Sequence, residues 1–269
     1  MLRARCSCSR KPADKSRHNR IPLQARIEQQ GKRHRVKGGN GSGREAAVIG
    51  SKQRRRRESD RRMLRAAVSL IGRHGTVGAS LADIGVDAGY SRGLPIQRFG
   101  TKLNLLETVI DMIEDRFMRQ VERRIGTRTG CDALAERIRI QMEAVRDMPD
   151  SAIALYHLIV DSTGTVPELK PRIARLHALY RDSLRAYLLQ ARKSGELRKD
   201  VDIEQSVRAI SGAISGICIQ ALVTGDTKKL GEDAEFVANL FVDRLAAAPD
   251  RRAVPAKGKP KKAAKATPA

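Results

Sequence analysis

The amino-acid sequence predicts an all-α fold, with a head of three helices followed by a helical bundle of about six helices. Between residues 58 and 248 apolar residues recur three and four positions apart, which places them on one face of a helix. Capping residues and glycines stand where these stretches begin and end. Alternating apolar and polar residues, which are typical of strands, do not form a convincing run.

The first two helices are predicted from an apolar stripe and a cap. A stripe over residues 61–73 predicts an amphipathic helix, which Gly75 ends. Ser80, with an acidic residue three positions later, predicts a capped helix over 81–88. We expect this helix to end at Gly89.

The third helix follows after a tight turn. Ser91 is expected to cap a short helix over 92–98, joined to the preceding one by Gly89 and Tyr90. Two short helices connected in this way form a helix-turn-helix, whose second helix can enter the major groove of DNA.

The remaining helices are longer. Thr101 and Asp202 are predicted caps, and Pro167 and Pro171 fall in a first helical turn, where proline costs least. The predicted ranges are 102–124, 132–147, 150–161, 167–193, 202–223 and 231–247.

Positive charge is concentrated at the two ends of the chain, whose formal net charge is +23. Residues 1–57 carry 18 Lys and Arg against three acidic residues, and residues 249–269 carry seven against one. We expect a disordered basic arm over 1–57 and a disordered Lys/Ala/Pro-rich tail over 249–269. The nearly neutral body then divides into a three-helix head over 58–110 and a second helical domain over 111–248.

Several protein classes are excluded by what the sequence lacks. No apolar run is long enough for a transmembrane helix, and the four cysteines are too few for a disulfide scaffold. Cys6, Cys8, His18 and His34 match no standard zinc-finger spacing, so no metal site is predicted. Common nucleophile, metalloprotease and phosphate-loop motifs are also absent, so we predict a cytoplasmic protein without enzymatic activity or cofactor.

The helix-turn-helix carries side chains suited to nucleic acid. Arginine can donate two hydrogen bonds to guanine and glutamine can pair with adenine, whereas hydroxyls, helix amino ends and lysine suit phosphates. The candidate DNA-binding residues are Ser80, Tyr90, Ser91, Arg92, Gly93, Leu94, Gln97, Arg98, Thr101 and Lys102. A generic helical hairpin with polar surface residues would show the same pattern.

The stretch from Ser80 to Lys102, SLADIGVDAGYSRGLPIQRFGTK, resembles the DNA-binding signature of the TetR family of bacterial transcriptional regulators. The resemblance covers residues 60–110 and implies a homodimer, a three-helix DNA-binding head and a helical domain with a ligand pocket. Where the family commonly has Thr-Leu-Tyr, this chain has Leu94-Pro95-Ile96. The tyrosine's usual phosphate contact is therefore not assigned to Ile96.

The resemblance also directs attention to the second half of the chain. The helices over 202–223 and 231–247 are apolar enough to form a four-helix seam between two copies, although a monomer core would look alike. Pocket candidates are Met142, Tyr156, His157, Tyr180 and Tyr187, for which core packing is the plainer interpretation.

Together these features predict a sequence-specific transcriptional regulator that binds a pseudo-palindromic operator and is released by a small-molecule effector. Such a protein would be cytoplasmic and associated with the nucleoid, without a membrane partner. The alternative is an architectural protein that binds DNA non-specifically through its basic arms.

Overall fold

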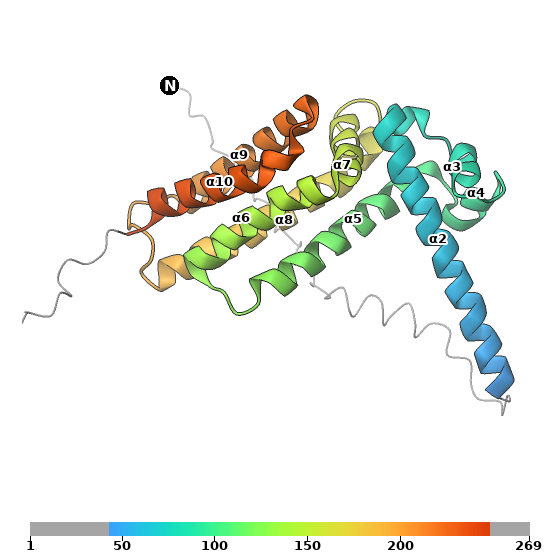
Figure 1. Cartoon of the computed structure of the whole chain (residues 1–269), viewed down its shortest axis with the longest axis horizontal. Helices are drawn as coiled ribbons and strands as arrows, with labels where there is room; N and C mark the ends of the chain where they lie inside the picture. Colours follow the sequence, from blue (N-terminus) through green and yellow to red (C-terminus); the bar gives the residue numbers. More distant parts are fainter. Residues whose placement is uncertain (1–42, 248–269) are drawn as a thin grey trace, which may run out of the picture. The chain divides into compact units, whose positions relative to one another are not determined.

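The computed structural model describes residues 43–247, with side chains from Lys52 onward, and this part of the chain is helical almost throughout (Figure 1). It contains no strand, and its one isolated antiparallel bridge joins Leu197 and Ala246. The predicted all-α class is confirmed. The helices are α2 (Gly43–Gly78), α3 (Leu81–Asp87), α4 (Leu94–Phe99), α5 (Lys102–Ile125), α6 (Gly130–Asp147), α7 (Pro149–Asp161), α8 (Lys170–Lys193), α9 (Ile203–Thr224) and α10 (Leu230–Leu245), with short 3-10 turns at Pro167–Leu169 and Thr227–Lys229.

Three of the predicted helix caps are present. In each, the side-chain oxygen of the cap accepts a hydrogen bond from the backbone N–H three residues on, which satisfies a donor that the helix leaves free. The pairs are Ser80 with Asp83 (3.1 Å), Thr101 with Asn104 (3.1 Å) and Asp202 with Gln205 (3.0 Å).

The predicted cap at Ser91 is wrong. Helix α4 begins at Leu94 rather than at residue 92, and its N-cap is Gly93, which has no side-chain cap. Ser91 contributes its backbone carbonyl instead, which accepts from the Leu94 N–H at 3.2 Å in the preceding turn. Pro95 fits the first turn of the shortened helix because its missing N–H would have no helical partner there.

The prediction of a disordered arm over residues 1–57 is wrong for residues 43–57, which belong to α2. Arginine and lysine are good helix formers, and the amphipathic segment that follows continues the same helix. Gly75, with φ +68°, interrupts α2 where the sequence predicted its end. Residues 1–42, with the cysteines and histidines weighed as a zinc site, and the tail over 248–269 lie outside the described residues.

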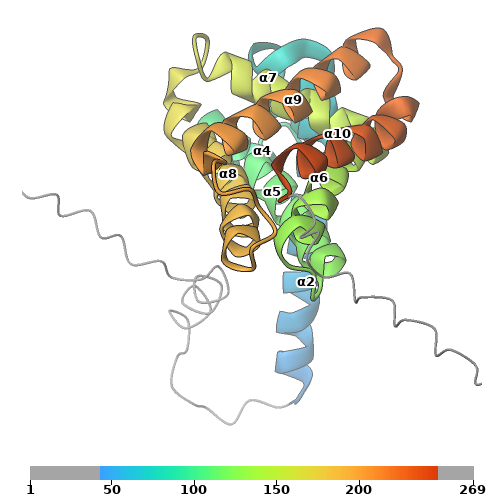
Figure 2. The ribbon, with the colours of Figure 1, turned by 90° about the vertical axis from the view of Figure 1, so that its left-hand side faces the viewer.

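Two apolar cores are joined by α5. Its first half packs with α2, α3 and the α7–α8 region in the head core, whereas Phe117, Val121 and Ile125 pack against α6. The larger core of the body is formed by α6, α8, α9 and α10. Helices α9 and α10 lie side by side next to α6 (Figure 2). Helix α5 therefore contributes residues both to the head core and to the smaller cluster that packs against α6.

Helix α9 is, by length and composition, apolar enough to cross a membrane, with a mean hydropathy of 1.5. In the fold one side of it is a core face, with Val207, Ile210, Ile214 and Cys218 buried against neighbouring helices. The opposite side is exposed and carries polar side chains as well as apolar ones, so α9 is a core helix with one uncovered face.

Candidate nucleic-acid interface and effector cavities

Helices α3 and α4 approach each other most closely at Gly85. A Cβ atom at this position would lie 2.5 Å from the Ser91 carbonyl oxygen and 3.1 Å from the Pro95 ring. The Tyr90 N–H donates to the Gly85 carbonyl at 2.8 Å, and Gly89 turns the chain with φ +77°. The close contact is therefore made at Gly85. The absence of a side chain at Gly85 allows the turn and α4 to lie close against α3.

One face of the turn and α4 is open to solvent. It carries Arg92, Gly93, Ile96 and Gln97, and Ile96 is 54% exposed. Arg92 takes part in none of the ion pairs formed by the described residues, so its guanidinium is free to bind an anion or a base edge. The chemistry predicted for the recognition helix is present at Arg92 and Gln97.

Three predicted contact residues are directed elsewhere. Arg98 lies against α2, where its Nε is 3.7 Å from the Asp60 carboxylate and its side chain is only 21% exposed. Tyr90 and Leu94 are partly buried against the head core. The expectation that Arg98 reads guanine does not agree with this geometry, because its guanidinium lies next to Asp60 and Ser59 of α2.

Three of the side chains predicted to bind phosphate form hydrogen bonds within the protein. The Ser80 hydroxyl donates to Asp83 at 2.5 Å, and the Lys102 ammonium donates to the Val77 carbonyl at 3.0 Å. Burial lowers the pKa of Lys102. Ser91 and Thr101 are exposed, although the Thr101 hydroxyl already accepts the capping hydrogen bond from the Asn104 N–H.

The body encloses a cavity of about 90 Å³ between α6, α7, α8 and α9. Tyr156 and Tyr180, two predicted pocket residues, line it together with Arg137 and Ser211. Burial raises the pKa of both tyrosines, to about 12 for Tyr180, so both hydroxyls are neutral donors.

The other predicted pocket residues lie outside this cavity. Met142 is fully buried in the core, and Tyr187 is partly buried against it. His157 lines a shallow outer groove that reaches the exposed Val223 of α9. Sequence reasoning missed Arg137, although it falls on the apolar stripe of α6 between Leu134 and Ile140.

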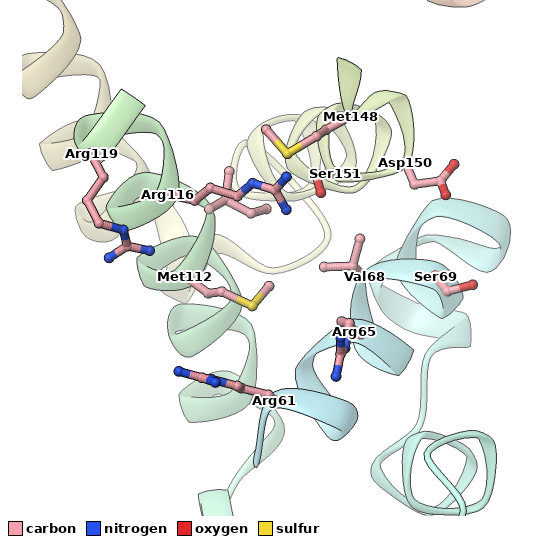
Figure 3. A pocket seen from close by; sticks show the side chains of 11 residues that line it. Arg61, Arg65, Val68, Ser69, Met112, Arg116, Arg119, Met148, Asp150 and Ser151 are labelled. Carbon is pink, nitrogen blue, oxygen red and sulfur yellow. The ribbon is translucent and has the colours of Figure 1, made fainter. Parts of the chain in front are cut away.

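A second cavity, of about 500 Å³, lies where α2, α5 and the start of α7 meet (Figure 3). Arg61 and Arg65 reach it from α2, and Arg116 and Arg119 from α5. All four arginines are exposed, so water solvates their charge and they need no bound anion.

The outer face of α9 and α10 carries large apolar side chains that are uncovered. Val223 is 81% exposed and Phe236 is 68% exposed, with Ile219 and Leu240 nearby in sequence on the same helices. Phe241 and Leu245 of α10, which belong to the predicted seam helix over 231–247, instead pack inward. An exposed patch of large apolar side chains is typical of an interaction surface.

Comparisons with known proteins agree with this architecture. Residues 136–236 match the family model described as the tetracyclin repressor-like C-terminal domain. Among solved structures, a TetR transcriptional regulator from Chloroflexus aurantiacus is similar with a TM-score of 0.64 and 18% identity over 72% of this chain and 100% of that one. A TetR transcription regulator from Haloarcula marismortui has a TM-score of 0.63 and 20% identity over 71% and 99%.

A third similar structure, a putative transcriptional regulator from Saccharomonospora viridis, was solved in complex with choline. It has a TM-score of 0.62 and 19% identity, and the match covers 71% of this chain and 99% of that one. No curated protein sequence matches the chain.

Proposed function

Because the chain carries the fold and the C-terminal domain of the TetR family of transcriptional regulators, we propose that it is a repressor released by a small-molecule effector. The observation that carries the proposal is the exposed face of the turn and α4, where Arg92, Ile96 and Gln97 are free to contact bases. Arg92 suits guanine, Gln97 suits adenine, and Ile96 can contact the methyl group of thymine. Ser91, Thr101 and Lys102 would hold the phosphate backbone.

Two copies are needed to read a two-fold operator. The uncovered apolar face of α9 and α10 supports a homodimer through these helices, with the two heads on successive major grooves. Phe236→Lys should convert the dimer to a monomer in analytical ultracentrifugation. The control Leu189→Lys changes an exposed leucine of α8 and should leave the dimer intact.

The test of the proposed function is selection of bound sequences from a random DNA pool by the full-length protein. We expect a pseudo-palindromic site with half-sites about one helical turn apart, or a multiple of it. Recovery of asymmetric or unrelated sequences would contradict sequence-specific regulation.

The arginine run over 54–57 on α2, which is exposed, gives the architectural alternative its support within the described residues. Replacing these four arginines with glutamine separates the two functions. If the protein is a regulator, the salt dependence of binding should become shallower while the selected sequence stays the same. If it is architectural, binding to every sequence should fall together.

The effector would bind in the body. The choline complex of the S. viridis regulator supports a small organic molecule as the kind of ligand such a domain holds. Binding there would favour a conformation in which the heads no longer match the operator, and by linkage the operator would weaken effector binding equally. A protein of this kind works in the cytoplasm, in contact with the nucleoid.

A further inference from the structure

Arg137 is a charged side chain in the interior of the body, 1% exposed. Its Nε donates to the Ser183 hydroxyl at 3.1 Å and its Nη1 donates to the Gln141 side-chain oxygen at 2.9 Å. Both acceptors are neutral. Among the described residues no carboxylate faces the guanidinium, although a buried cation without a counter-charge is costly.

Aromatic rings supply part of the missing compensation. The guanidinium carbon lies 4.6 Å from the centre of the Phe117 ring and 5.7 Å from that of Tyr180. Ring faces attract a cation but carry no net charge. Desolvation still lowers the pKa of Arg137 to about 10, which shows that its surroundings disfavour the charged form.

The cavity beside Arg137 is lined by hydrogen-bond donors. The Ser211 hydroxyl faces it, buried and without a hydrogen-bond partner. Arg181 and His177 also line it, and no aspartate or glutamate does. Neutral polar side chains such as Gln141 and Ser215 also line it, together with an apolar part that includes Leu155, Ile159, Ile214 and Leu184. A cavity with two arginines, an unpartnered hydroxyl and no acid is complementary to an anion that has an apolar part.

We propose that the effector is a small organic carboxylate, which pairs with Arg137 and accepts a hydrogen bond from Ser211. This inference rests on the proposed function and specifies its ligand. The arginine can offer two parallel N–H donors to a carboxylate, which a neutral ligand cannot match. The cavity is smaller than the roughly 300–1,000 Å³ that drug-sized ligands occupy, so the acid carries a short apolar tail.

The same guanidinium connects the ligand to the head. Phe117, whose ring it covers, belongs to α5, and the first half of α5 lies in the head core. A carboxylate that draws Arg137 away from Phe117 changes what α5 packs against. The ligand therefore acts on the helix that supports the recognition surface.

The experiment is thermal unfolding of the full-length protein without DNA. The probes are butyrate, hexanoate and benzoate, each compared with its neutral amide of nearly the same shape. We expect at least one acid to raise the Tm in a concentration-dependent way while the amides leave it unchanged. Arg137→Met should remove this shift, and Ser211→Ala should raise the Kd about tenfold.

If Arg137→Met does not fold, Arg137→Lys and Ser211→Ala provide the test. Lysine keeps the charge but loses the planar pair of donors, so binding of the acid should weaken. The proposal is overturned if no acid raises the Tm, if acids and amides act alike, or if the shift survives both substitutions. Selection of operator DNA does not involve Arg137, so failure of the carboxylate proposal is distinguishable from failure of the proposed function.

Discussion

The head and the body use arginine in opposite ways. On the head, Arg92 is exposed, takes part in no ion pair among the described residues and is surrounded by water. In the body, Arg137 is buried beneath aromatic rings with no carboxylate facing it from the described residues. The first arrangement costs little in stability and leaves the charge available to a large external anion. The second removes the charge from water, which is costly when no opposite charge compensates it.

The free energy of binding is therefore expected to come from different interactions at the two sites. Binding at the exposed surface depends on salt, because phosphate contacts release counterions. Binding in the cavity depends on desolvated hydrogen bonds, which salt screens much less. The two functions should therefore be separable by single substitutions.

The largest effect is expected from Gly85→Ala in the head. The added Cβ would meet the Ser91 carbonyl oxygen at 2.5 Å, and backbone cannot move aside as a flexible side chain can. Overpacking of this kind costs roughly 1–3 kcal/mol and occasionally more, so operator affinity should fall by about 150-fold or more where the backbone clash is not relieved. Operator titration by fluorescence anisotropy measures the loss.

Gly164→Ala is the matched control, because a Cβ at Gly164 meets no atom within 4 Å and the residue does not have a positive φ. It should leave operator affinity unchanged. Equal affinities for Gly85→Ala and the parent protein would show that α4 does not depend on the close crossing.

A smaller effect, confined to base recognition, is expected from Gln97→Ala. Gln97 is exposed on α4, so truncation leaves the cores intact and Tm unchanged. Loss of a base contact made by two hydrogen bonds costs about 1–3 kcal/mol of binding free energy. This cost corresponds to a fall in operator affinity of roughly 5- to 150-fold. Repeating the DNA selection with this variant should relax one position in each half-site. A uniform loss over all sequences would instead assign Gln97 to the phosphate backbone.

The features that could be predicted from the sequence are those determined locally. Ser80, Thr101 and Asp202 cap their helices because the cap needs only the next three residues. Ser91 failed as a cap because the start of α4 depends on how the turn packs against Gly85 and Pro95. That contact joins two helices, so it cannot be read from a capping pattern.

Arg137 shows the same limit at the second site. In the sequence Arg137 follows Glu136 and stands two positions before Arg139. Charged residues spaced in this way are typical of a solvated helix face. The place of Arg137 on the stripe with Leu134 and Ile140 becomes meaningful only when three further helices cover that stripe. Tyr156 and Tyr180, chosen for their aromatic character, line the cavity because large rings pack inside whether or not they bind a ligand.

Arg98→Ala should have a small effect and should change stability rather than base preference. Its guanidinium is 3.7 Å from Asp60 and 3.5 Å from the Ser59 hydroxyl, so it supports α4 on α2. A partly exposed pair of this length contributes up to about 1 kcal/mol. Urea unfolding should show this loss, and the selected DNA sequence should stay the same. A changed base preference would instead indicate that Arg98 contacts DNA bases.

The smallest effect tests whether head and body move together. The Thr76 hydroxyl, just after the interruption of α2, donates to Asp161 at the end of α7 at 2.6 Å, and the Thr76 N–H approaches the same oxygen at 3.4 Å. Thr76→Val keeps the shape and removes the hydroxyl, at a cost of about 1 kcal/mol. Hydrogen exchange at Val77 and Ala79 should become about fivefold faster, because the segment opens more often.

Thr108→Val is the matched control for this substitution. The Thr108 hydroxyl donates at 2.6 Å to the Asn104 carbonyl of its own helix, so its loss should not change exchange at Val77 or Ala79. Equal acceleration in both variants would indicate a general loss of stability. Acceleration in Thr76→Val alone would show that the hydrogen bond to Asp161 holds the start of the head to the body.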